Sequence, residues 1–296
     1  MASPHPNPSP SEGRGVLSAN AENESPLPSR ERARVRGCRC SAPFFLLLFV
    51  SLALSGCGNW TALLPITPLG QKHFWFLLSG IPLTLLISFY SIIFGSIIGL
   101  SGALMLRSRH RTSRWIAAGY VDLFRKLPLY VVLLWIYFGF PTALRDLPDD
   151  IKSIPVISLF ANMTAVTAAT VGLSLNAGAF LIEVFRAGIE SVSKGQIDAA
   201  YSFGMSRALA MRRIVLPQAL RRMLPPTVNQ YISVVKDSSL AGAIGVLEIT
   251  RQATLLQTQI LHALEIYTFL GLQYFVILTL LTWLSQYLER KFPQYN

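Results

Sequence analysis

The longest polar segment of the sequence contains residues whose types and spacing suit a contact with another protein. Its members are a carboxylate, two small residues, a glycine and an apolar end with proline: Asp198, Ala199, Ala200, Gly204, Ile214, Leu216 and Pro217. A helix N-terminus favours negative charge, two alanines let another chain approach closely, and glycine permits a turn at a helix end. The pattern therefore predicts a short helix with Asp198 near its start and a turn at Gly204. Leu216-Pro217 is expected to break the pattern before the next apolar segment.

The same segment has a simpler interpretation that stays open at this point. It is rich in basic residues, namely Arg186, Lys194, Arg207, Arg212, Arg213, Arg221 and Arg222. A basic amphipathic segment beside a membrane can lie on the lipid surface without contacting any protein.

Five further polar residues stand in apolar surroundings: Asn176, Asn229, Gln230, Lys236 and Asp237. A charge inside a membrane segment is costly and usually faces a cavity or a partner. Lys236 and Asp237 either line a pathway for a zwitterionic substrate or form a structural ion pair with neighbouring segments, and we favour the structural role. The other three either hydrogen-bond a substrate or join helices, and joining helices is the better expectation.

The composition excludes a soluble enzyme of ordinary kind. Only 14% of the 296 residues are charged and 52% are hydrophobic, whereas about 25% of residues are charged in typical soluble domains. The net charge of +11 would indicate nucleic acid in a soluble protein, but in an apolar chain it marks basic loops on the cytoplasmic side of a membrane. Neither a Gly-x4-Gly-Lys-Ser/Thr phosphate loop nor a His-Glu-x2-His metal motif occurs. We expect no catalytic, cofactor or metal site and no nucleic-acid partner.

Five long apolar runs predict the fold class. They cover residues 73–106, 127–144, 153–182, 223–247 and 266–288, and each can cross a hydrocarbon core that needs roughly 17–25 residues. Basic residues gather between the first and second runs, between the third and fourth, and in the tail. By the positive-inside rule, the first run begins outside and the C-terminus lies inside. The sequence therefore predicts an all-α integral membrane protein with five transmembrane helices.

The N-terminal region has a different composition. Residues 1–41 are rich in Pro, Ser, Glu and Arg and are predicted to be a disordered basic leader. Residues 42–56 resemble the apolar part of a secretory signal. A Leu-Ser-Gly sequence precedes Cys57, as in a bacterial lipoprotein signal that is cleaved before a lipidated cysteine. An uncleaved anchor with an incidental cysteine, or a translation start at Val35, remains open.

The loop spacing resembles the signature of ABC importer permeases, Glu-Ala-Ala-x3-Gly-x9-Ile-x-Leu-Pro, with aspartate at the first position. The chain is also similar to the polar-amino-acid (histidine/glutamine-type) branch of these permeases at several separated places. These are Tyr120–Arg125, Leu127–Leu129, Ile136–Gly139, Leu173–Asn176, Glu183–Ile189, Ser193–Gln196, Leu216–Ala219, Leu224–Pro226, Asn229-Gln230 and Lys236–Leu240. The resemblance covers about residues 74–296 and implies the five-helix fold of an ABC importer permease.

The resemblance also implies how the protein works and with which partners. Two permease subunits, identical or related, would form the pathway in a bacterial inner membrane. A dimer of cytoplasmic ABC ATPases would bind beneath them and hold the ATP, and a periplasmic binding protein would deliver the amino acid. The segment from Asp198 to Gly204 would be a coupling helix docked on the ATPase, within a cytoplasmic loop at about 186–222. Residues 57–73 would be an external segment ahead of the permease domain at 74–296.

Two other functions remain open from the sequence. One is a permease for another small solute, of methionine or peptide type, that uses the same loop. The other is a lipid-anchored structural or sensor protein with the same topology, which predicts no ATPase partner.

Overall fold

The computed structural model describes residues 60–63, 65–145, 148 and 154–291, and every regular element in these ranges is helical. The predicted leader, the signal-like segment and Cys57 lie outside the described residues, so their assignments stay predictions. The predicted external segment at 57–73 is described from Trp60 onward, apart from residue 64, and contains a 3-10 turn, η1 (Trp60–Ala62), and the start of a helix.

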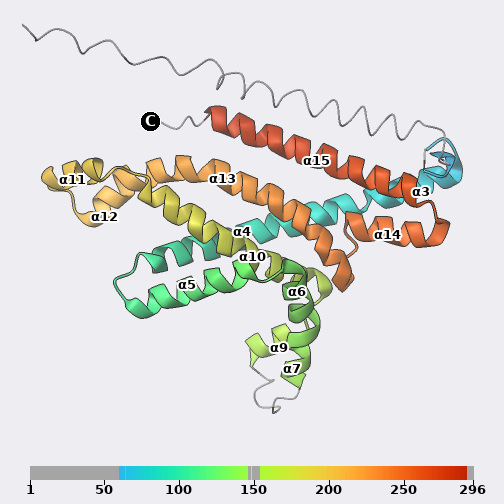
Figure 1. The fold of residues 1–296 in the computed structure, drawn as a ribbon, viewed down its shortest axis with the longest axis horizontal. Helices are drawn as coiled ribbons and strands as arrows, with labels where there is room; N and C mark the ends of the chain where they lie inside the picture. Colours follow the sequence, from blue (N-terminus) through green and yellow to red (C-terminus); the bar gives the residue numbers. More distant parts are fainter. Residues whose placement is uncertain (1–59, 64, 146–147, 149–153, 292–296) are drawn as a thin grey trace, which may run out of the picture. The chain divides into compact units, whose positions relative to one another are not determined.

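In the described ranges, the body is built from long helices joined by shorter ones (Figure 1). The long helices are α4 (Gly80–Leu106), α10 (Ala165–Glu190), α13 (Leu216–Asp237) and α15 (Ala263–Lys291). The shorter helices are α3 (Pro68–Leu78), α5 (Arg111–Lys126), α6 (Leu129–Leu134), α7 (Phe140–Arg145), α9 (Pro155–Ala161), α11 (Lys194–Ser202), α12 (Arg207–Ala210) and α14 (Ile249–Ile260). Two π-turns, η2 (Trp135–Gly139) and η3 (Met211–Val215), and a 3-10 segment, η4 (Ser238–Ile244), complete the elements.

Three described segments are long and apolar enough to cross a membrane: Pro68–Leu106, Ala165–Glu190 and Ala263–Leu288. A further candidate combines Arg111–Lys126 with Leu129–Arg145, and this pair bends by 105° at its break. Pro128 lies in the break, where it lacks the N–H that a continuous helix would need. The all-helical, apolar character of the chain agrees with the prediction, and the number of five spans stays a prediction.

Two of the predicted spans have different boundaries in the structure. The run at 153–182 is divided, because Thr164 is extended and its hydroxyl accepts the N–H of Thr167, which starts α10 at Ala165. The run at 223–247 is helical in α13 only as far as Asp237, continues as η4, and ends at Gly245 with a φ of 91°. Local capping therefore sets these ends, and an apolar run does not reveal it.

Helices α4 and α10 pack closely because small residues lie between them. A Cβ added to Gly95 would lie 3.1 Å from the Cβ of Ala177, and one added to Gly99 would lie 2.7 Å from the Cβ of Leu181. On α10, a Cβ at Gly178 would lie 2.8 Å from a methyl carbon of Ile98. Small residues let helix backbones approach in this way in membrane proteins, where van der Waals packing replaces the hydrophobic effect between helices.

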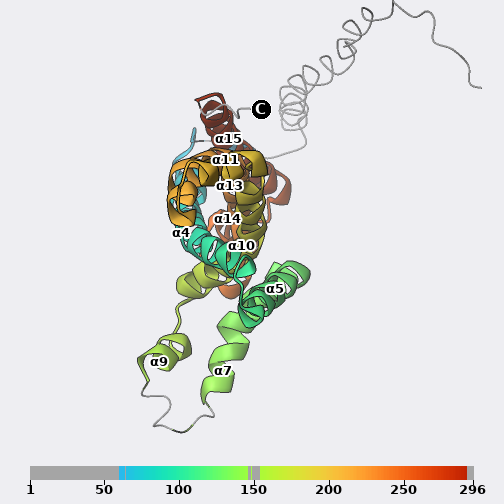
Figure 2. The same cartoon turned by 90° about the vertical axis from the view of Figure 1, so that its left-hand side faces the viewer.

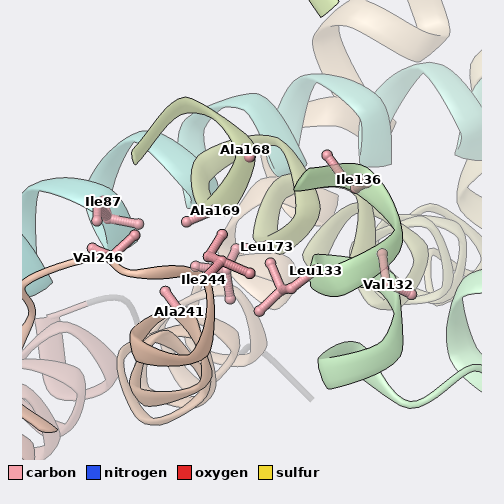
Figure 3. Packing of buried hydrophobic residues seen from close by; sticks show 10 residues of the cluster. All are labelled: Ile87, Val132, Leu133, Ile136, Ala168, Ala169, Leu173, Ala241, Ile244 and Val246. Carbon is pink, nitrogen blue, oxygen red and sulfur yellow. The ribbon is translucent and has the colours of Figure 1, made fainter. Parts of the chain in front are cut away.

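A cluster of buried apolar side chains joins α4, α6, η2, α10 and the region of η4 (Figure 3). Its buried members are Ile87, Val132, Leu133, Ile136, Ala168, Ala169, Leu173, Ala241, Ile244 and Val246. The residues that follow α13 are thereby held against the α4–α10 pair, so the far end of α13 has a fixed anchor.

Buried polar groups tie the start of α14 to the start of α4. The carboxylate of Glu248 caps α14 by accepting the N–H of Thr250 at 2.8 Å and that of Arg251 at 2.7 Å. The N–H of Ile249 is donated to the hydroxyl of Thr84 at 3.2 Å. Each of these backbone donors lacks an intrahelical partner at a helix start, so the side chains satisfy groups that would otherwise be unpaired.

The two basic loops lie at the same end of the helices. Figure 1 shows α11 and α12 at one end of α10 and α13, and the turn between α4 and α5 toward that end. Figure 2 looks at this end, with α11 and α5 in front. The packing agrees, since Ala103 near the end of α4 clusters with Ile189 and Val192 near the end of α10.

Candidate functional site

The loop singled out by its spacing forms two short helices joined at a glycine. The first, α11, ends in a Schellman motif: the N–H of Gly204 is donated to the carbonyl of Tyr201 at 2.9 Å, and that of Met205 to the carbonyl of Ala200 at 3.1 Å. Gly204 has a φ of 77°, a left-handed conformation that glycine adopts without a steric penalty. The predicted turn at Gly204 is therefore present, and its geometry explains why glycine stands there.

Asp198 does not occupy the place expected for it. Ser193 is extended and α11 begins at Lys194, so Asp198 lies in the second turn of the helix. The interaction of a carboxylate with the helix dipole falls off within the first turn. The expected stabilisation of Asp198 at a helix N-terminus is therefore wrong, and its exposed carboxylate is available for a partner instead.

The two alanines differ in their surroundings. Ala199 is exposed, whereas Ala200 is only 2% exposed and faces the interior of the loop. The prediction that both alanines present a face to another protein is thus wrong for Ala200. Ala200 is a positioning residue that allows α11 to fold against α12 and η3, and Ala199 is the residue of the pair that a partner can touch.

The chain after Gly204 does not break at the predicted place. Ser206 caps α12 by accepting the N–H of Leu209 at 3.3 Å, and α12, η3 and α13 then follow one another with helical backbone angles. The first two residues of α13 are Leu216, which is exposed, and Pro217. The π-turn directly before them holds Ile214, which is half-buried. The wider turn of η3 accommodates the proline that would disturb a regular helix. Leu216-Pro217 therefore continues the helix instead of breaking it.

The loop is fastened to the helices from which it projects. The guanidinium of Arg222 on α13 donates to the carbonyl of Ser191, which follows the last residue of α10. One turn earlier on α10, Arg186 pairs with Glu183 at 2.7 Å and with Glu190 at 3.2 Å. The ends of α10 and α13 are therefore joined, and the loop begins and ends on a shared base.

Phe203 was not anticipated as a functional residue. Its side chain is 86% exposed at the end of α11, directly before the turn at Gly204. Tyr201 beside it is also exposed. A large aromatic side chain left in solvent at a loop tip is a feature of protein–protein contacts, and an aromatic residue directly before a helix-terminating glycine was the signal in the sequence.

Asn176 joins two helices. Its side-chain N–H is donated to the carbonyl of Phe124 at 3.1 Å, and the residue is only 8% exposed. In a regular helix that carbonyl would accept an N–H from the residue four positions later, which here is Pro128 and has none. The amide of Asn176 thus supplies the donor that the proline lacks, as expected for a helix-joining residue.

Replacing Asn176 with leucine is expected to lower the free energy of unfolding by about 0.6–2 kcal/mol, since the Phe124 carbonyl loses its partner. Thermal unfolding of the purified protein in detergent measures this. Asn229→Leu, at an exposed position of α13, is the matched control and should unfold like wild type. Equal losses in the two variants would contradict this role of Asn176.

A polar face runs along the exposed side of α13. Asn229, Ser233 and Lys236 are spaced by four and three residues, and so share one side of the helix. Asn229 and Lys236 are exposed, and Gln230 and Asp237 are half-buried. Within the described residues no ion pair links Lys236 or Asp237 to another helix, so the favoured structural ion pair is not found there. In the same ranges no three His, Cys, Asp or Glu side chains gather at a metal-binding distance.

These features define a class of protein: a helical membrane component that projects a fastened two-helix loop from one end. A family model described as "Binding-protein-dependent transport system inner membrane component" matches residues 91–293. The chain belongs to this family of inner-membrane transport components, whose name states their dependence on a binding protein.

Individual relatives agree with the family. The chain is 36% identical to a probable amino-acid ABC transporter permease protein of Bacillus subtilis over 229 residues, which are 77% of this chain and 94% of that protein. It is 34% identical to the glutamine transport system permease protein of Escherichia coli K12 over 79% of this chain and 97% of that protein. A solved structure of an amino acid ABC transporter with histidines matches with a TM-score of 0.65 and 33% identity, covering 74% of this chain and 95% of that one.

Proposed function

We propose that this chain is the permease subunit of an ATP-driven importer of polar amino acids. The observation that carries the proposal is the loop: it has the spacing of an ABC importer permease and folds as two exposed helices on a shared base. The relatives whose names include amino-acid transport are similar over most of their length. ATP would be bound by the partner ATPases, because the chain has no phosphate loop of its own.

The contact with the ATPase dimer is assigned to the outer side of α11. Asp198, Ala199 and Phe203 are exposed there, and they offer a charge, a small flat patch and an aromatic anchor. The other residues of the signature would act through the shape of the loop; these are Ala200, Gly204, Ile214, Leu216 and Pro217. This arrangement is what a groove on an ATPase needs: a short helix held by its ends so that movement of the groove also moves the helix.

The translocation pathway is assigned to the polar face of α13. A row of uncharged and charged polar groups on the outside of an apolar chain is costly against lipid and is instead satisfied by water or by another subunit. A second permease subunit, identical or related, facing α13 would enclose Asn229, Ser233 and Lys236 in a pathway with polar walls. An ammonium and amides suit the carboxylate of a zwitterionic amino acid.

The charges and the fold together support one orientation in the membrane. Both basic loops lie at one end of the helices (Figure 1), and the positive-inside rule assigns that end to the cytoplasm. The first span then begins outside, the C-terminus is cytoplasmic, and a periplasmic binding protein would approach the opposite end, near η1 and α14. The surrounding partner is the lipid of a bacterial inner membrane.

Uptake by the reconstituted complex tests the function. The tagged full chain is purified with the ATPase it retains, placed in liposomes that contain ATP, and supplied with its binding protein and labelled glutamine, arginine, histidine or methionine. We expect ATP-dependent accumulation of one or more polar amino acids and little of methionine. Accumulation of methionine alone would favour the methionine type of permease, and absence of any ATPase would favour a structural or sensor protein.

The same liposomes test the polar face. Asn229→Leu is expected to reduce the rate of uptake several-fold while the ATPase still co-purifies, because the change lies on the pathway and away from the loop. Unchanged uptake would remove Asn229 from the pathway.

A further inference from the structure

The turn between α4 and α5 carries a charged surface to which the proposed transport function gives no binding partner. Its members are Arg107, Arg109, Arg111 and Arg114, all exposed, and we call them the α4–α5 arginine cluster. From residue 107 to residue 121 the sequence contains no acidic residue, and Asp122 pairs with Lys126 at 3.0 Å. Within the described part of the chain, no acidic side chain forms an ion pair with these four guanidinium groups.

The cluster begins where the outer apolar surface of α4 ends. Ile97, Leu100 and Leu104 are exposed on α4, and in an integral membrane protein such a surface faces hydrocarbon. Arg107 follows Leu104 by three residues, which corresponds to about 4.5 Å along a helix. The arginines therefore lie at the depth where acyl chains give way to phosphate groups.

Apolar side chains next to the cluster support this position. Trp115, one turn after Arg111, is 69% exposed, and Ile116 is exposed beside it. Tryptophan concentrates at the boundary between hydrocarbon and headgroups because its ring is apolar and its N–H is polar. A surface that faced only water, or only an acidic protein groove, would gain nothing from an uncovered tryptophan and isoleucine directly after the arginine cluster.

We propose that the α4–α5 arginine cluster binds the headgroups of anionic phospholipids in the leaflet that surrounds the ATPase end of the chain. A guanidinium offers paired N–H donors that match the oxygens of a phosphate, and clustered basic residues beside a membrane helix attract anionic lipid. The contact is with lipid and not with the ATPase, because α11 and α12 extend beyond this turn at the same end (Figure 1) and would meet a cytoplasmic partner first.

Quenching of tryptophan fluorescence by brominated lipids tests the proposal. The full chain is placed in phosphatidylcholine nanodiscs with a fraction of brominated phosphatidylglycerol or, in parallel, brominated phosphatidylcholine, and Trp115→Phe isolates the Trp115 signal. We expect brominated phosphatidylglycerol to quench the Trp115 fluorescence about tenfold more strongly than brominated phosphatidylcholine, consistent with several basic residues acting together. Replacement of the four arginines by glutamine, or high salt with wild type, should bring the preference close to one.

Matched variants decide between sources of the effect. Replacing four arginines of the other basic loop by glutamine should leave the lipid preference intact; these are Arg207, Arg212, Arg213 and Arg221. Replacing the four arginines of the α4–α5 arginine cluster by lysine should retain much of the preference. Equal quenching by the two lipids, or a preference that survives the loss of the cluster, would overturn the proposal. Loss of the lipid preference in millimolar inorganic phosphate would also overturn it, because it indicates a site for free anions. So would a variant with glutamine at the four arginines of the cluster that loses the co-purified ATPase but keeps the lipid preference, because it assigns the cluster to a protein partner.

Discussion

Replacing Gly204 with valine is expected to abolish most ATP-driven uptake while the helices of the membrane domain stay folded. The residue has a φ of 77°, and a left-handed conformation costs a residue with a Cβ about 1–2 kcal/mol, with β-branched residues at a further disadvantage. No atom lies within 4 Å of a Cβ added there, so the cost comes from the backbone alone. The turn would open, and Phe203 and the exposed side of α11 would leave the arrangement that we propose for the contact with the ATPase.

Two other substitutions make this expectation specific. Gly204→Asn should keep most of the activity, because asparagine tolerates the left-handed conformation at a helix end. Gly195→Val, in the first turn of α11 with no atom within 4 Å of the added Cβ, controls for a larger side chain in the same helix. Co-purified ATPase per permease is the measurement, and a decrease of about tenfold is expected for Gly204→Val, since 1.4 kcal/mol corresponds to tenfold in a binding constant. If the valine variant keeps the ATPase and the uptake of wild type, the turn has no role in coupling.

Replacing Gly99 with leucine is expected to prevent stable folding of the membrane domain. A Cβ at this position would lie 2.7 Å from the Cβ of Leu181 and 3.2 Å from its backbone carbonyl carbon. Backbone atoms inside a helix cannot rotate away as a side-chain end can, so α4 and α10 would have to separate. Overpacking of a well-packed core costs about 1–3 kcal/mol and at times more. Here the displaced helices would be α4 and α10, which both contribute buried residues to two of the apolar clusters.

The matched control is Gly119→Leu on α5, where no atom lies within 4 Å of an added Cβ. We expect the Gly99 variant to aggregate or to unfold at clearly lower temperature during size-exclusion chromatography and thermal denaturation in detergent. The Gly119 variant should behave like wild type. A Gly99→Leu protein with the elution volume and unfolding temperature of wild type would show that the helices tolerate separation.

The loop shows how far sequence reasoning reaches. Spacing predicted a helix that turns at a glycine, and the structure has that turn because only local backbone geometry is involved. The places of Asp198 and Ala200 were misjudged for a different reason. The start of α11 depends on the conformation of Ser193, and the burial of Ala200 depends on how α11 folds against α12 and η3, which residue types alone do not reveal.

For the membrane segments too, the sequence predicted some features and did not reveal others. Long apolar runs correctly indicated a helical membrane protein, since apolar length is a property of the sequence. They did not reveal the bend before Leu129 or the separate starts of α9 and α10. The partner of Asn176 was likewise out of reach, because it is a carbonyl left vacant by Pro128 on another helix. Predicting it requires knowing that these two helices are neighbours.

The helical path from α12 through η3 into α13 includes a π-turn and, inside α13, Pro225 and Pro226, and this has a mechanical consequence. The 31 residues from Arg207 to Asp237 correspond to about 46 Å of helix, with one end in the exposed loop and the other anchored in the buried cluster around η4. Helices bend at π-turns and at internal prolines, so this path has two places where it can bend: η3 and the Pro225-Pro226 pair. Asn229, Ser233 and Lys236 all follow the proline pair in α13, so a bend there would change the direction of the polar face relative to the loop.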